Sequence, residues 1–244
     1  MPGIGLYDVN QLSSKFITDK NRVITVNLPE NDDIIIPEEE DLQHVIDKVL
    51  SMNIEPYIDA VSDEPLVEHL QPPGRVVSEI ILGDIGVTQW ILENGVRVIL
   101  KPTDYKNDEI LFNAHSPGGH SLIEDFNYIA AITAVPIIGR SGLGNFTKIE
   151  LDKLISDKIM SLNITINELT EGFYGSVSSQ DIETMFQLIY QTFNAPRADS
   201  TSFLAYKARM EGWIENRNAR PENVFRDSIQ VTKTQHHFRA RPWT

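Results

Sequence analysis

Residues 87–103 read VTQWILENGVRVILKPT, and this stretch decides the fold class. Asn94-Gly95 is the preferred dipeptide of a tight two-residue hairpin turn, because both residues tolerate positive φ. The runs on either side, TQWIL and VRVIL, are rich in β-branched and aromatic residues, which favour strands. The stretch therefore predicts an antiparallel β-hairpin.

Further strands are predicted on both sides of this hairpin. Residues 76–86 (VVSEIILGDIG) precede it and residues 108–117 (DEILFNAHSP) follow it, each with an apolar run typical of a strand. Residues 159–178 (IMSLNITINELTEGFYGSVS) predict two short antiparallel strands. A separate strand is expected at 22–28, where Pro29 would end it.

Apolar residues at helical spacing occupy the intervals between these strands. Thr147 and Glu150 form a capping box, which marks the start of one helix. The expected helices span 8–19, 38–52, 123–138, 147–158, a segment from Ser179 or Asp181 to 193, 199–217 and 221–231. This order predicts an α+β fold, an antiparallel sheet flanked by helices and preceded by a helical and extended linker.

Charge and proline divide the chain. Residues 1–86 carry 17 Asp and Glu against 5 Lys and Arg, whereas the remainder is nearly balanced. Proline fixes φ and lacks an N–H, so an extended linker is expected where four prolines fall between residues 53 and 74. We therefore expect three parts: the end of a preceding α+β domain (1–30), an acidic linker with one helix (31–74) and an α+β domain (75–244).

The composition excludes several classes of protein. The chain has 244 residues and no cysteine, which excludes a disulfide scaffold, a thiol nucleophile and Cys-ligated metal. The formal net charge of −14 argues against a nucleic-acid-binding surface. No apolar run approaches the length of a membrane span. The start, MPGIGLYDVNQ, lacks the pattern of a signal peptide, so we expect either an intracellular protein or an internal piece of a longer one.

Residue patterns alone identify no catalytic apparatus. His115 and His120 bracket a Pro-Gly-Gly turn and could converge on a metal, but ordinary turn histidines are the simpler interpretation. The glycines of 139–144 lack the Lys-Ser/Thr of a phosphate loop and follow a helix rather than a strand. No serine lies in G-x-S-x-G or S-x-x-K. We therefore predict no catalytic residue and no metal ligand from these patterns.

Several stretches, in order, resemble the pitrilysin/insulinase family of zinc peptidases. They are 87–122 (VTQWILENGVRVILKPTDYKNDEILFNAHSPGGHSL), 141–158 (SGLGNFTKIELDKLISDK) and 171–199 (EGFYGSVSSQDIETMFQLIYQTFNAPRAD). Residues 16–30 resemble the end of the second domain of the large bacterial four-domain members, and 38–85 resemble the linker between their halves. The resemblance implies a LuxS/MPP-like metallopeptidase fold, with most of the non-catalytic third domain in 75–244.

The resemblance also implies where zinc lies. In these enzymes the first domain carries H-x-x-E-H, while the third and fourth domains repeat the fold without metal and help enclose a peptide. Alignment by eye on Gly142–Phe146 places Thr133 and Ile137 at the positions of the two histidines and Pro136 at the position of the glutamate. Residues 121–170 contain no histidine, so the resemblance implies a domain without cofactor, with zinc in an absent N-terminal domain.

The resemblance suggests partners and a place in a longer protein. We expect a peptide or unfolded protein substrate, and the catalytic N-terminal half, as partners. Gly118, Gly119, Gly142, Leu143 and Gly144 are our expected substrate-proximal residues. The family fold implies about sixty further residues after Thr244, so we expect a piece truncated at both ends, and its strand at 22–28 would lack its parent sheet.

Two alternatives stay open beside this interpretation. One is a scaffold subunit of the same fold whose parent chain has no peptidase activity anywhere. The other is an independent acidic binding module unrelated to proteolysis. Location in the periplasm or cell envelope is suggested by the resemblance alone.

Overall fold

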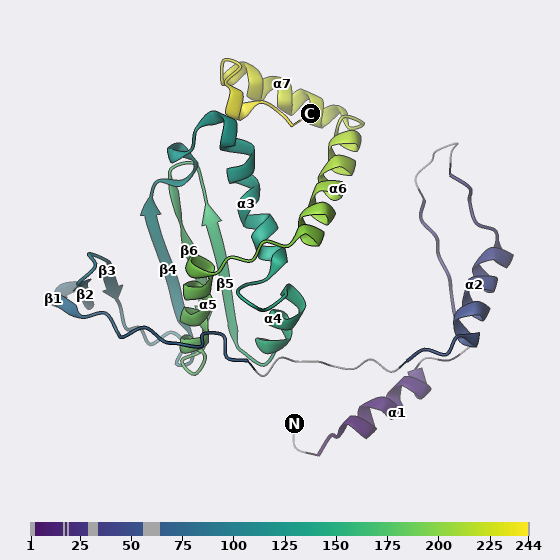
Figure 1. Cartoon of the computed structure of the whole chain (residues 1–244), viewed down its shortest axis with the longest axis horizontal. Helices are drawn as coiled ribbons and strands as arrows, with labels where there is room; N and C mark the ends of the chain where they lie inside the picture. The colour runs from purple at the N-terminus through teal and green to yellow at the C-terminus, as the bar shows by residue number, and fades with distance from the viewer. Residues whose placement is uncertain (1–2, 17, 19, 29–33, 56–63, 244) are drawn as a thin grey trace. The chain divides into compact units, whose positions relative to one another are not determined.

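The computed structural model describes residues 3–16, 18, 20–28, 34–55 and 64–243. The chain divides into two compact units, Met1–Ile58 and Asp59–Thr244, and each is described by itself. The helices described in the first unit are α1 (Leu6–Phe16) and α2 (Glu39–Ser51), which confirm the helices expected there (Figure 1). The expected boundaries at residues 30 and 74 stay predictions.

Helix α2 has a well-formed start and no buried side chain. The Glu38 N–H donates to Asp41 Oδ2 at 2.9 Å, which satisfies a backbone donor at the helix entrance. Acidic residues crowd the first turn, where the helix dipole stabilises them. None of the residues of α2 is buried, so its apolar stripe is not covered within the described part of this unit.

The prediction of a strand at residues 22–28 is wrong. These residues have no regular secondary structure, and Val23 is 86% exposed. A strand is stable only when a neighbouring strand takes up its N–H and C=O groups. Among the described residues, no such neighbour pairs with this segment.

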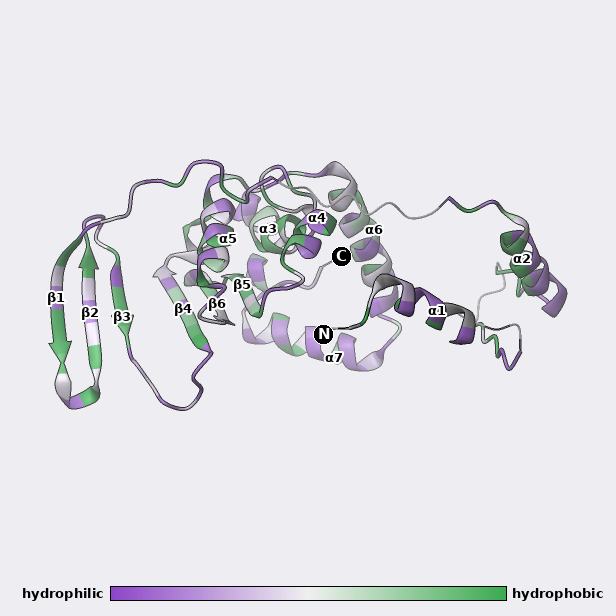
Figure 2. Cartoon of the chain, turned by 90° about the horizontal axis from the view of Figure 1, so that it is seen from below, coloured by the Kyte–Doolittle hydropathy of each residue, from purple (hydrophilic) through white to green (hydrophobic). Residues whose placement is uncertain are grey.

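In the second unit, six described strands form two antiparallel sheets rather than one (Figure 2). One sheet has the order β1-β2-β3 and the other the order β4-β6-β5. The bounds are β1 (Val76–Leu82), β2 (Val87–Leu92), β3 (Arg97–Leu100), β4 (Ile110–Pro117), β5 (Met160–Ile166) and β6 (Thr170–Val177). The antiparallel pairing expected from the sequence is confirmed.

The predicted hairpin forms, but its turn differs from the expected one. Gly95 has φ of +85°, whereas Asn94 does not have positive φ. The Gly95 N–H donates to the Leu92 carbonyl at 2.8 Å, and the Asn94 side chain accepts from the Val96 N–H at 3.1 Å. The loop is therefore a three-residue turn with only its last residue left-handed, a common alternative for the same dipeptide.

The helices of the second unit largely agree with expectation. Helix α3 begins at Tyr128 rather than 123, because short 3-10 turns at Gly119–Leu122 and Asp125–Asn127 precede it. The capping box of α4 is confirmed, with the Thr147 N–H donating to Glu150 Oε2 at 2.8 Å. The bounds are α3 (Tyr128–Ser141), α4 (Lys148–Leu154), α5 (Ile182–Asn194), α6 (Ser200–Arg217) and α7 (Pro221–Lys233).

The core of the second unit lies between one face of the β4-β6-β5 sheet and the helices. Phe173 and Val177 of β6 and Met185 of α5 are buried, and the rings of Phe112 and Phe186 meet edge to face at 5.6 Å. A connected cluster joins Leu66, Phe146, Leu151 and Leu188. Burial of these apolar groups is the main force that holds the sheet against the helices.

Leu66 belongs to this core although its segment was expected to be linker. Leu66 is 6% exposed, and its backbone carbonyl accepts a hydrogen bond from the Gln191 carboxamide of α5. The segment around Leu66 is therefore part of the folded unit.

Candidate functional site

The Gly118-Gly119 turn is fastened to the turn between β5 and β6. The Gly118 N–H donates to the Leu169 carbonyl and the His120 N–H to the Asn167 carbonyl, both at 2.8 Å. Gly119 is buried with φ of +60°, and a Cβ there would lie 2.1 Å from the Asn167 carbonyl oxygen. Only glycine permits so close a backbone approach.

The Gly142–Gly144 loop is equally structural. Gly142 has φ of +96° and ψ of −165°, a region that glycine alone occupies readily, and a Cβ would lie 2.1 Å from the Phe146 carbonyl oxygen. The Gly144 N–H donates to the Ala195 carbonyl at 2.8 Å, and Leu143 forms an isolated bridge with Pro196. This loop therefore joins the end of α3 to the end of α5.

The structure does not bring these two loops together. They lie at opposite ends of α3, as Figure 1 shows. A helix of this length spans about 20 Å. The expected role of Gly118, Gly119, Gly142, Leu143 and Gly144 near substrate stays a prediction, and the five residues do not form one site.

The residues of α3 do not fit a zinc ion. Thr133 is buried, and its hydroxyl donates within the helix, to the carbonyls of Ile129 at 2.8 Å and Ala130 at 3.2 Å. Pro136 and Ile137 have no donor atom in their side chains. Among the residues that the structure describes, no group of three or more His, Cys, Asp or Glu is arranged to hold a metal. No chemical step through zinc is therefore assigned to this helix.

His115 and His120 occupy different environments. His115 is exposed on β4. His120 is 8% exposed, and its ring meets the Tyr128 ring edge to face at 5.9 Å. The Nε2 atom of His120 is buried, and no hydrogen-bond partner for it lies among the residues that the structure describes. The ring of His120 thus packs mainly as a hydrophobic body.

Arg239 is a residue that sequence reasoning missed. Its guanidinium donates to Asp125 Oδ1 at 2.8 Å and to the His120 carbonyl at 2.9 Å, and it also bonds the Ile123 carbonyl. It lies over the Tyr128 ring, with Cζ 4.9 Å from the centroid. A single side chain therefore ties the C-terminal segment to the loop that contains Gly118 and Gly119. The excess of arginine near the C-terminus was the only feature of the sequence that pointed to the contacts of Arg239.

Three carboxylates with lowered pKa values cap local structure. The Ser178 hydroxyl, at 2.7 Å, and the Ile159 N–H, at 3.0 Å, both donate to Asp181 and lower the pKa of that carboxyl. Thr147 lowers the pKa of Glu150, and Ser202 lowers the pKa of Asp199, also through hydrogen bonds. These shifts arise from helix and loop caps, so they indicate stability rather than catalysis.

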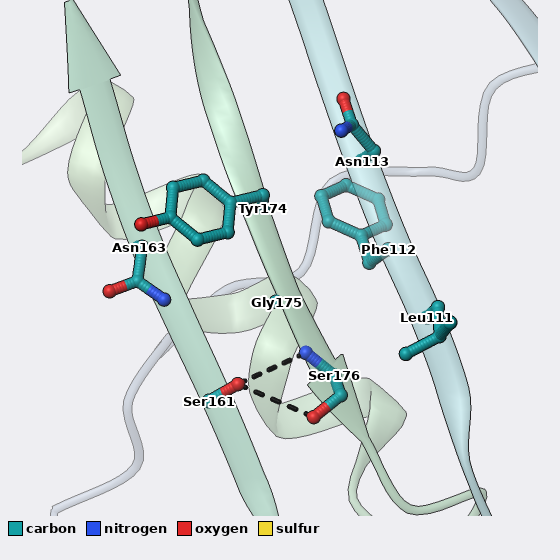
Figure 3. A pocket seen from close by; sticks show the side chains of 8 residues that line it. All are labelled: Leu111, Phe112, Asn113, Ser161, Asn163, Tyr174, Gly175 and Ser176. Atoms are coloured by element: carbon teal, nitrogen blue, oxygen red, sulfur yellow. Dashed lines mark hydrogen bonds between the residues drawn. The ribbon is translucent and has the colours of Figure 1, made fainter.

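The second face of the β4-β6-β5 sheet carries an open depression, and Figure 3 shows the side chains that line it. We call it the open face and define it by six residues. They are Leu111, Asn113, Ser161, Asn163, Tyr174 and Ser176. The depression has a volume of about 490 Å³. Alternation in FYGSV and SLNITI was the signal for this face, because every second side chain of a strand lies on the same side.

Comparison with known proteins gives a consistent picture. No family model matches the chain. The sequence is 24% identical over 249 residues to a "Zinc protease PQQL-like" protein of Arabidopsis thaliana, which covers 99% of this chain and 23% of that protein. The resemblance to the pitrilysin-type zinc proteases is confirmed. The chain spans about a quarter of the length of this relative.

Two solved proteases share the fold. The periplasmic protease PqqL of Escherichia coli superposes with a TM-score of 0.65 and 16% identity over 85% of this chain and 23% of its own. A mutant of the ferredoxin protease FusC, solved in complex with Arabidopsis ferredoxin, superposes with a TM-score of 0.63 and 16% sequence identity. The match covers 86% of this chain and 23% of the FusC chain. The α+β metallopeptidase fold predicted from the sequence is therefore confirmed.

In the described ranges of the chain, no helix is both long and apolar enough to span a bilayer.

Proposed function

We propose that this chain is a non-catalytic portion of a zinc metalloendopeptidase. It forms part of the substrate chamber and of the hinge beside it, while the zinc site lies in an N-terminal domain outside these residues. One observation carries the proposal: nearly all of the chain matches a zinc protease, yet it spans only 23% of that protease.

Two further points support this proposal. Helix α3, which the alignment by eye places at the zinc helix of the active domain, has no donor set for the metal. The solved neighbours include one protease in complex with a protein, ferredoxin. The partners we propose are therefore a peptide or unfolded protein substrate and the catalytic half of the parent. The periplasm or cell envelope is the proposed location, because the neighbour PqqL is periplasmic.

Zinc stoichiometry tests the proposal directly. The chain is loaded with zinc, dialysed and measured by elemental analysis, and we expect nearly no zinc per chain. Close to one tightly held zinc per chain would overturn the proposal, with His115 and His120 the first ligands to examine.

A longer polypeptide that carries this chain tests the chamber role. We expect that deleting residues 75–244 abolishes hydrolysis of a fluorogenic peptide while the bound zinc remains. If the longer polypeptide holds no zinc and cleaves no peptide, the scaffold alternative replaces the proposal.

A further inference from the structure

Helices α3 and α6 bring two arginines onto one aromatic ring. The helices pack against each other, and the Ser202 hydroxyl at the start of α6 donates to the Arg140 carbonyl near the end of α3 at 3.1 Å (Figure 1). The guanidinium carbon of Arg140 lies 5.8 Å from the centroid of the Tyr206 ring, and that of Arg209 lies 5.4 Å from it. Two cations from different helices therefore share one partly buried ring.

The charges of these two arginines are not balanced by carboxylates. Both residues are exposed, and neither forms an ion pair with any residue that the structure describes. The acidic residues next to them along α6 are engaged elsewhere. Asp199 accepts from the Ser202 N–H at 2.6 Å, and Glu211 pairs with Lys207 at 3.6 Å. The ring is thus flanked by two positive charges without a described counter-charge.

The ring also orders the two side chains before any ligand arrives. Arginine normally loses rotamer freedom when it binds, and this loss opposes binding. Contact with the Tyr206 ring already restricts both side chains, and Arg140 Nη1 also donates to the Pro136 carbonyl at 2.6 Å. Two like charges held near each other repel, and an anion that contacts both relieves that repulsion. The arrangement therefore favours an anionic ligand over no ligand.

The charge of the whole chain decides which kind of anion fits. The formal net charge is −14, so a long polyanion such as a nucleic acid is repelled by the protein as a whole. Salt screens exposed charges beyond roughly 8 Å. A short ligand that reaches only the two arginines is therefore attracted, whereas one that spreads over the surface is not. The carboxylate matches the planar donor fork of arginine and occurs in short acidic segments of polypeptides.

We propose that Arg140, Tyr206 and Arg209 form a docking surface for a short acidic segment of a partner polypeptide. Each guanidinium receives one carboxylate of the segment through paired N–H···O bonds. The Tyr206 ring holds the two guanidinium groups in place and supplies apolar contact between them. The inference goes beyond the function proposed above, because it concerns an acidic partner of this chain and involves neither zinc nor hydrolysis.

The spacing of the two cations agrees with such a segment. Both guanidinium groups contact the same ring, so they are neighbours on the surface. In an extended polypeptide, side chains two residues apart lie on the same side of the chain, about 7 Å from each other. Two acidic residues separated by one other residue can therefore reach both arginines from one side.

Binding of a defined probe by the 244-residue chain tests this surface. The probe is a capped heptapeptide, Gly-Ser-Glu-Ser-Glu-Ser-Gly, and its control has glutamine in place of both glutamates. Binding is followed through the Nε–Hε signals of Arg140 and Arg209 in NMR titrations at slightly acidic pH, where glutamate is still ionised. We expect a Kd of about 1 mM for the acidic peptide, because exposed ion pairs are weak. Raising NaCl from about 50 to 500 mM should increase this Kd at least about fivefold.

Matched variants locate the contact. Arg140→Gln and Arg209→Gln should each increase the Kd of the acidic peptide about threefold. Arg226→Gln is the control, because Arg226 is exposed on α7 and its loss changes the net charge by the same amount. Tyr206→Leu keeps both charges but removes the ring, and it should also increase the Kd about threefold, whereas Tyr206→Phe should not. Thermal melts verify that each variant is folded.

Several results would overturn the inference. One is no change in the two arginine signals at about 10 mM acidic peptide. Another is equal binding of the glutamine peptide, which would show that the carboxylates are not recognised. An equal loss of affinity in Arg226→Gln would show that only net charge matters. Tighter binding of a single-stranded oligonucleotide than of the acidic peptide would replace the polypeptide partner by a nucleic acid.

Discussion

At the scale of single residues, backbone conformation limits what the site loops tolerate. Gly142 combines positive φ with a carbonyl oxygen where a Cβ would stand. Gly139, three residues earlier in α3, has neither constraint and no heavy atom within 4 Å of its ideal Cβ. The backbone therefore requires glycine at position 142 but not at position 139. Alanine substitution at each position distinguishes the two cases.

We expect Gly142→Ala to lower the free energy of unfolding by about 2 kcal/mol, because alanine strains both the backbone and the Phe146 contact. Gly139→Ala should be neutral or stabilising by up to about 1 kcal/mol, because alanine favours a helix. Urea unfolding of both variants measures this. Equal stability of the two would contradict the glycine geometry of the loop.

A second residue-scale prediction concerns acid stability. The pKa of Asp181 is lowered from 3.8 by the donors of Ser178 and Ile159. A lowered folded-state pKa contributes stability above the unfolded value, and this contribution is lost as pH falls through the folded one. Asp181→Asn should therefore reduce Tm at pH 7. The difference in Tm between this variant and the unmodified chain should become smaller below pH 3.8.

Thermal melts across this pH range measure the effect of Asp181→Asn. Asp104→Asn serves as the control, since Asp104 lies in the loop between β3 and β4. A Tm difference that is independent of pH would show that the carboxylate charge of Asp181 does not contribute.

At the scale of elements, the two sheets differ in how they are supported. The β4-β6-β5 sheet has helices against one face and contains buried Phe173 and Val177. In the β1-β2-β3 sheet no residue is buried, and Ile81 and Ile99 are more than half exposed on opposite faces. Local stability follows buried contacts, so the first three strands should open more readily.

Amide hydrogen exchange followed by mass spectrometry tests this difference. We expect the amides of β1–β3 to exchange at least about tenfold faster than those of β4–β6. Equal protection of both sheets in the monomeric chain would contradict this prediction.

At the scale of the whole molecule, long-range contacts assemble the second unit. Leu66 enters the core formed by residues about a hundred positions later, and Arg239 bonds the loop around Asp125. Hydrogen bonds to a charged group contribute about 1.5–3 kcal/mol each when they are shielded from solvent. Arg239 should therefore hold the C-terminal segment in place.

We expect Arg239→Met to speed chymotryptic cleavage after Phe238 about tenfold, because cleavage follows the population of the opened segment. Arg226→Met, on the exposed side of α7, should leave the rate unchanged. Limited proteolysis under native conditions measures both rates. Identical cleavage of the two variants would show that the contacts of Arg239 do not retain the segment.

Local features of this protein were predictable because they depend on neighbours in sequence. The hairpin at 87–103, the α4 capping box and the helices of the second unit follow from residue types at short spacing. The strand at 22–28 failed for the opposite reason, since a strand depends on a partner that its own sequence does not contain.

The candidate site could be predicted only in part. The sequence pointed to the glycine turns. It did not reveal why glycine is required there, because the constraint at Gly119 is the carbonyl oxygen of Asn167 and the constraint at Gly142 is that of Phe146. Alternation alone places Tyr174 on one side of its strand. It does not reveal which residues of β4 and β5 lie beside the ring, because that depends on the register of strands far apart in the chain.

The sequence by itself determined the α+β class, the antiparallel pairing, the absence of thiol chemistry and the relation to the zinc proteases. Only the tertiary structure decided that the strands form two sheets, that Leu66 belongs to the core, and that Asn113, Tyr174 and Asn163 form one row. The physical reason is the separation in sequence of the residues that interact. Propensity and capping act within one turn or strand, whereas burial and register arise when distant segments pack together.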